Sequence, residues 1–202
     1  MKLVTFQSFD ALKYLINNGE LICDKKYFDE KKYGIAYNFI VNKMNSSILN
    51  NTKARYPIWC FVKCYNGICP PRHKGKRIDG YDVKITFEKN SNEVFVTDFR
   101  RYSFVLNNKY IPKSINDKNI FTDELKKHGN DKYINNKIVN SFDRCITMDS
   151  DILQGCVWNI KLSEVCSIEI LKNDGYVYGS LNYVRSNGKR INWIEDYYKR
   201  IN

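Results

Sequence analysis

The stretch Lys2-Leu3-Val4-Thr5-Phe6-Gln7-Ser8 decides how this chain enters its fold. Its apolar and β-branched residues predict a strand that ends at Gln7. Ser8 is a favoured helix N-cap, and the apolar spacing that follows predicts a helix over 9–18, which Gly19 ends. Because Gln7 lies where the strand passes into the helix, we expect its side chain to face a ligand.

The rest of the chain alternates helical and strand patterns. A helix is predicted over 29–45, and the run 56–65 is apolar on both faces, as a central strand is. Further strands are expected over 81–88, 94–96, 157–162 and 166–171, helices over 99–106 and 138–146, and a polar, partly helical insert over 114–130. We therefore predict an α+β fold, with a main domain over 1–171 and a C-terminal hairpin and helix over 172–202 packed on it.

The composition is that of a folded, basic protein. Of 202 residues, 43% are hydrophobic and 14% aromatic, which is enough for a core and excludes a disordered chain. Lys and Arg number 33 against 22 Asp and Glu, so the net charge is +11. Such a charge attracts RNA, DNA or phosphate-bearing small molecules. The abundance of Lys, Asn, Ile and Tyr is also typical of an AT-rich genome, and codon bias is an equally good explanation of many lysines.

Basic side chains interleave with aromatic ones at three places, a combination that single-strand nucleic-acid binders use. The first is Lys53-Arg55-Tyr56 and the last is Arg100-Arg101-Tyr102. Between them lies a basic loop that carries Arg72, Lys74, Lys76 and Arg77. The alternative for each cluster is a solvated charged face beside core aromatics.

The seven cysteines indicate reduced thiols. They are Cys23, Cys60, Cys64, Cys69, Cys145, Cys156 and Cys166. An odd count without a secretion signal argues against a disulfide framework, and no apolar run is long enough for a membrane span, so we expect a cytoplasmic protein. Cys60, Cys64, Cys69 and His73 have zinc-like spacing, but two of these cysteines fall within one predicted strand, and we expect no metal.

Several enzyme classes are disfavoured. The ten glycines assemble no phosphate-binding loop, which argues against a nucleoside triphosphatase or a Rossmann dehydrogenase. The two histidines, His73 and His128, lie in polar segments without a cysteine-protease signature. Adjacent acidic pairs such as Asp123-Glu124 are explained by helix capping or solvent exposure.

Four stretches carry a family resemblance. They are residues 3–8, residues 56–59, residues 98–112 with Asp98-Phe99, Val105-Leu106-Asn107 and Ile111-Pro112, and residues 154–165 with Gln154-Gly155-Cys156-Val157-Trp158. On these the chain is identified as a member of an uncharacterised bacterial family known only as a domain of unknown function. The resemblance covers residues 1–171, and its motifs are structural rather than catalytic.

The opening strand, helix and Gly-x-Leu exit are also similar to those of small ADP-ribosyltransferase-like domains. That resemblance implies a split or strongly bent mixed sheet, flanked by N-terminal helices, around a cleft that binds NAD. It makes Gln7 and Gln154 the catalytic candidates, with Gln154 in the place of an acidic residue. The NAD-binding candidates are Thr5, Gln7, Tyr33, Tyr37 and Trp59.

The leading hypothesis is therefore a NAD-binding, ADP-ribosyltransferase-like protein that transfers ADP-ribose to a protein or nucleic-acid acceptor. It requires Gln7 and Gln154 to line one hollow, and the neutral amide of Gln154 stabilises a developing cation less than a carboxylate does. The first alternative is a non-catalytic nucleic-acid-binding module that uses the Arg72–Arg77 loop with Arg100 and Arg101. The second is a phage or mobile-element protein that acts by contact with a host protein.

Overall fold

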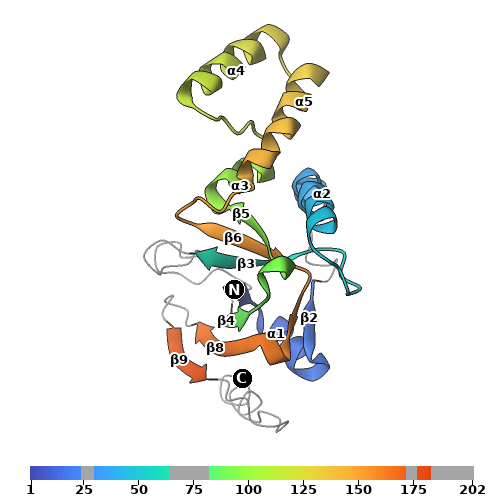
Figure 1. Ribbon diagram of the computed structural model, residues 1–202, viewed down its shortest axis with the longest axis vertical. Coiled ribbons are helices and arrows are strands. Elements are labelled where there is room, and N and C mark those ends of the chain that lie inside the picture. The colour runs from blue at the N-terminus through green and yellow to red at the C-terminus, as the bar shows by residue number, and fades with distance from the viewer. Residues whose placement is uncertain (24–29, 64–81, 172–176, 183–202) are drawn as a thin grey trace.

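The computed structural model describes residues 1–23, 30–63, 82–171 and 177–182. One antiparallel sheet organises them, in the strand order β5-β6-β3-β1-β4-β8-β9 (Figure 1). The strands are β1 (Lys2–Gln7), β3 (Ile58–Lys63), β4 (Val83–Glu88), β5 (Phe95–Asp98), β6 (Leu153–Val157), β8 (Val165–Leu171) and β9 (Val177–Asn182). Two short strands, β2 (Glu20–Ile22) and β7 (Asn159–Lys161), form a second sheet.

The α+β class is confirmed, and one detail of the sheet differs from expectation. Each described pairing is antiparallel, so the sheet is antiparallel rather than mixed. The predicted strand 157–162 is divided, because the chain leaves β6 at Trp158 and enters β7 in the small sheet. Strand periodicity continues across this point, which is why the sequence showed a single strand.

The N-terminal unit forms as its sequence predicts. The Ser8 hydroxyl accepts the Ala11 N–H (3.2 Å) and starts α1 (Phe9–Asn18). Gly19 ends the helix at φ +75°, a left-handed conformation that glycine adopts without steric cost, and its N–H donates to the Leu15 carbonyl (2.9 Å). The helix buries Leu12 and Leu15.

The sheet has apolar residues on both faces and therefore two cores. On one face Leu3, Cys60 and Ile85 pack with the buried leucines of α1. On the other, Phe95 and Cys156 pack under α2 (Glu30–Ser47) and α3 (Phe99–Leu106). Side chains alternate along each strand, so neighbouring residues serve different cores.

A helical hairpin extends from one end of the molecule (Figure 1). It consists of α4 (Ile115–His128) and α5 (Lys132–Ser141), which confirms a helix in the polar insert and places the next helix earlier than expected. Its α4 has no buried residue and depends on a few polar and ring contacts. Three short 3-10 turns complete the described fold: η2 (Ser91–Glu93), η3 (Phe142–Cys145) and η4 (Leu162–Glu164).

The prediction of a hairpin and helix in 172–202 lies almost wholly outside the described residues. Within 172–202 the structure describes residues 177–182, and they pair with β8 as an added strand of the main sheet. Within the described part of the chain, no helix combines the length and apolarity needed to cross a membrane.

Candidate functional site

Aromatic side chains gather on one face of β3. Trp59 and Phe61 are two residues apart on this strand and point to the same side of the sheet. The Trp59 indole N–H donates to the Tyr37 hydroxyl (2.9 Å), and the Tyr37 ring meets the Tyr56 ring edge to face at 6.4 Å between centroids. The Tyr102 ring of α3 lies 4.8 Å from that of Trp59.

Phe61 continues the cluster toward the centre of the sheet. Its ring contacts Phe6 of β1 at 6.3 Å and Phe99, the first residue of α3, at 5.6 Å. We define the aromatic face as these rings together: Phe6, Tyr37, Tyr56, Trp59, Phe61, Phe99 and Tyr102. All except Tyr102 are half-buried.

Two basic clusters that are distant in sequence flank the aromatic face. Lys53 and Arg55 are exposed just before Tyr56, and Arg100 and Arg101 are exposed in the first turn of α3. The contacts from Tyr56 through Tyr37 and Trp59 to Tyr102 connect the two clusters. The sequence showed each cluster alone, and the fold brings them to the ends of one series of rings.

Tyr102 belongs to the core rather than to the surface of this series. Its side chain is 1% exposed, and its hydroxyl donates to the Ala36 carbonyl (3.3 Å). Burial raises the pKa of this hydroxyl far above its ordinary value, so it remains neutral. Tyr102 therefore packs on Trp59 from α3, and the half-buried rings carry the exposed part of the aromatic face.

The register of the strands separates the two glutamines. Gln154 of β6 lies opposite Phe61, and Phe61 lies opposite Val4 of β1. Residues directly opposite one another in an antiparallel pair share a face, so Gln154 points to the aromatic face. Gln7 is three residues beyond Val4, an odd offset, and therefore points to the other face.

Two contacts support this separation. Phe6 touches Phe61 on the aromatic face, while the Gln7 amide donates to the Thr5 hydroxyl (2.8 Å) on the opposite face. The Thr5 hydroxyl donates in turn to the Trp59 backbone carbonyl (2.7 Å). The expected hollow lined by both Gln7 and Gln154 is wrong, because sequence patterning gives no register between strands.

The other residues predicted to contact NAD also lie on different faces of the sheet. Tyr37 and Trp59 touch on the aromatic face, and Tyr33 lies one helical turn before Tyr37 on α2. Thr5 joins Gln7 on the opposite face. The structure thus brings Gln154, Tyr37 and Trp59 to one side of the sheet.

Gln154 has an unusual environment. Thr97 of β5 is its direct cross-strand partner, and the Gln154 Oε1 and Thr97 Oγ1 atoms are both buried without a hydrogen-bond partner. Phe61 lies on the other side of Gln154, and Phe99 follows Thr97 by two residues. The sequence analysis missed Thr97, Phe61 and Phe99, although the two-residue spacing from Trp59 to Phe61 was a usable signal.

The predicted basic loop and most of the predicted zinc array lie outside the described residues. These are Arg72, Lys74, Lys76 and Arg77 for the loop, and Cys64, Cys69 and His73 for the array. Cys60 of β3 is buried in the core on the α1 side of the sheet, where desolvation raises its thiol pKa well above the usual value and keeps it protonated. In the described ranges no three His, Cys, Asp or Glu side chains form a group that could hold a metal ion.

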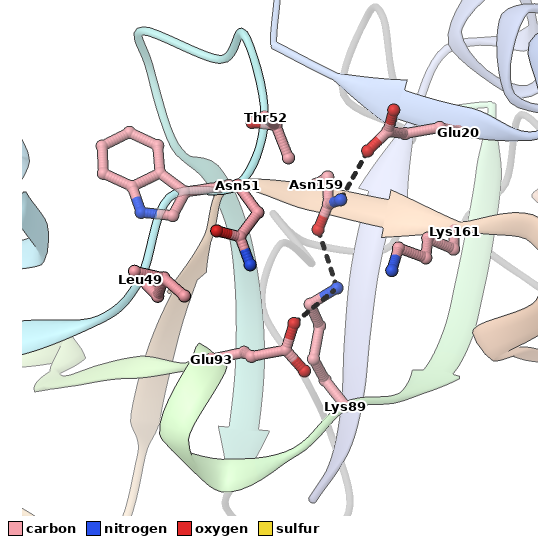
Figure 2. A pocket seen from close by; sticks show the side chains of 9 residues that line it. Glu20, Leu49, Asn51, Thr52, Lys89, Glu93, Asn159 and Lys161 are labelled. Carbon is pink, nitrogen blue, oxygen red and sulfur yellow. Dashed lines mark hydrogen bonds and ion pairs between the residues drawn. The ribbon is translucent and has the colours of Figure 1, made fainter.

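A second polar site surrounds Lys89 (Figure 2). This lysine is buried, and its ammonium donates to the Asn159 amide oxygen (2.8 Å) and to the Glu164 carboxylate (2.9 Å), with Glu93 at 3.9 Å. Figure 2 shows Lys89 reaching Asn159 and Glu93, and Asn159 donating onward to Glu20.

The recess beside Lys89 has a cavity volume of about 100 Å³. This is well below the roughly 300–1,000 Å³ of small-molecule sites. The ammonium has three acceptors, the Asn159 amide oxygen and both oxygens of Glu164, so the lysine acts as a brace between the end of β4, β7 and η4 rather than as a free amine. No sequence pattern marked it.

This chain belongs to the family described as "Domain of unknown function (DUF3841)", whose model matches residues 2–166. The membership expected from the sequence is therefore confirmed. No curated protein and no solved structure matches the chain significantly. The family gives no activity, so function has to be argued from the site.

Proposed function

We propose that this protein binds single-stranded nucleic acid across the aromatic face. The observation that carries the proposal is the series of ring contacts that joins the Lys53-Arg55-Tyr56 cluster to the Arg100-Arg101-Tyr102 cluster. Bases would stack against the half-buried rings, and the exposed Arg and Lys side chains at both ends would contact phosphates.

Base stacking on aromatic rings and phosphate contacts with basic side chains both contribute substantially to binding of a single strand. Stacking of one base on an aromatic ring contributes about 1–3 kcal/mol and tolerates any base. Each neutralised phosphate releases counterions and makes binding steeply dependent on salt. The net charge of +11 adds long-range attraction for a polyanion.

A single strand fits the aromatic face better than a duplex. Trp59 and Phe61 of β3 and Tyr56 just before it present half-buried rings, which only an unstacked base can meet. Bases in a duplex are stacked on one another and present only their edges. We therefore expect weaker and purely electrostatic binding of duplexes.

Fluorescence anisotropy with a labelled single strand of about 12 nucleotides tests the proposal directly. We expect the double variant Arg100→Glu and Arg101→Glu to weaken binding by more than about tenfold and to reduce the salt slope. The matched control is Lys126→Glu with Lys127→Glu, the same charge change on exposed residues of α4.

A general loss of positive charge would affect both double variants equally, and that result would contradict binding at the aromatic face. Equal affinity for a single strand and a duplex of the same length would also contradict it. Circular dichroism of each variant shows whether it retains the fold.

NAD binding by an ADP-ribosyltransferase-like site stays a prediction with weaker support. The hypothesis requires Gln7 and Gln154 to line one hollow, but the strand register puts the two side chains on opposite faces of the sheet. It keeps Gln154 on the same side of the sheet as Trp59 and Tyr37. Calorimetric titration with NAD and ADP-ribose, repeated on Gln154→Ala and Gln7→Ala, tests it, and loss of binding in Gln7→Ala alone would favour a site on the opposite face.

A further inference from the structure

Two residues that pair across neighbouring strands on the aromatic face each carry a buried oxygen atom without a hydrogen-bond partner. The two atoms are Gln154 Oε1 and Thr97 Oγ1, on residues that stand directly opposite one another in β6 and β5. Thr97 is fully buried and Gln154 is 9% exposed. Directly opposite residues have Cβ atoms about 5 Å apart, so one small group can meet both side chains.

A buried oxygen without a hydrogen-bond partner lowers the stability of the fold, so a ligand that supplies the missing donor would be expected to bind there. A polar atom that loses its hydrogen bond to water on burial destabilises the fold unless a partner replaces that bond. Here two such atoms come from adjacent strands. The Gln154 amide oxygen can only accept, and the Thr97 hydroxyl can accept as well as donate, so a donor with two hydrogens, such as an NH₂ group, can bond to both.

Nucleobases differ in whether they carry such an NH₂ group. Adenine, cytosine and guanine carry an exocyclic amine with two N–H bonds, whereas uracil and thymine carry none. Two aromatic rings belong to neighbouring positions: Phe61 is opposite Gln154, Phe99 follows Thr97 by two residues, and the two rings contact each other at 5.6 Å between centroids. A base stacked on these rings would bring its edge toward the two oxygens, with its phosphate near the exposed Arg100.

We propose that Gln154 and Thr97 read the exocyclic amine of one base, so that the bound strand must present adenine, cytosine or guanine at that position. The inference rests on the proposed function and adds a base-selective position to it. This reading requires that the amide rotate about its last bond to turn Oε1 toward the base, and that the Thr97 hydroxyl accept the second hydrogen.

The test uses strands that differ by one amine. A uridine strand with a single central adenosine is compared with the same strand carrying central purine riboside, which is adenosine without its amine. We expect the native protein to bind the adenosine strand about tenfold more tightly. In Thr97→Val and in Gln154→Met that preference should disappear, while stacking and salt dependence remain.

Thr86→Val is the matched control, because Thr86 is a buried threonine of β4 that faces Val4 rather than Gln154. It should keep the preference for adenosine. Thermal melting accompanies each variant. Thr97→Val should melt no lower than the native protein, since it removes an unpaired hydroxyl.

The outcomes separate the inference from the proposed function. Equal binding of the adenosine and purine strands by the native protein, or a preference that survives Thr97→Val, would overturn the base-reading pair while leaving strand binding intact. Failure of every strand to bind would overturn the proposed function and the inference with it. Competition by adenosine monophosphate as effective as the strand itself would keep the amine-reading pair and contradict nucleic acid as its source.

Discussion

Replacing Lys89 by methionine measures how much the buried brace contributes to stability. The Lys89 side chain is 1% exposed and satisfies Asn159 and the Glu164 carboxylate, which is 17% exposed. Removing one partner of a fully buried ion pair costs about 3–5 kcal/mol. Because Glu164 keeps some solvent and also accepts the Lys161 N–H (2.9 Å), we expect a smaller loss, about 2–3 kcal/mol.

Lys84→Met is the matched control. Lys84 also donates to a glutamate, Glu169 (3.1 Å), but its side chain is 26% exposed, and the loss should be at most about 1 kcal/mol. Urea denaturation of both variants gives the two free energies. The double variant Lys89→Met with Glu164→Gln should recover part of the stability lost in Lys89→Met, because it removes the unpaired carboxylate. Equal losses for Lys89→Met and Lys84→Met would refute the reasoning.

Three further predictions concern packing and ionisation. Gly155→Ala should destabilise by about 1–3 kcal/mol in urea, because a Cβ there would lie 2.9 Å from Cys60 Sγ, and Cys60→Ala should relieve it. Burial raises the pKa of the Cys145 thiol to about 12 and that of Cys156 well above its usual value. These folded pKa values exceed those of the unfolded chain, so stability should fall as pH rises above about 8.5, and both thiols should react with a disulfide reagent only on unfolding. The Lys113 N–H, the Tyr110 hydroxyl and Arg144 lower the pKa of Asp117, so the α4–α5 hairpin should loosen as pH falls below about 4. Faster hydrogen exchange in α4 at low pH, abolished by Asp117→Asn, would confirm it.

Local structure could be read from this sequence because local signals determine it. Ser8 and Gly19 mark the ends of α1 by capping, and the alternation in 81–88 predicts the strand that the structure has as β4, Val83–Glu88. The same reasoning found Tyr37, Trp59 and the two basic clusters that the fold joins. These residues carry spacing or composition that needs no knowledge of distant contacts.

What the sequence could not give is the pairing between strands. A shift of one residue in register moves every side chain to the other face, and nothing in β1 or β6 alone specifies that Val4 is level with Phe61 and Gln154. The expected meeting of Gln7 and Gln154 failed for this reason. The Lys89 brace was missed similarly, since Asn159 and Glu164 are about 70 residues away in the chain.

Photo-crosslinking of a single strand, with the linked peptides identified by mass spectrometry, tests the central claim most directly. A strand that contacts the aromatic face should link to the peptide around Tyr56, Trp59 and Phe61, and Tyr56→Ala should reduce the yield. Links confined to the α4–α5 hairpin, or a yield unchanged by Tyr56→Ala, would contradict the account.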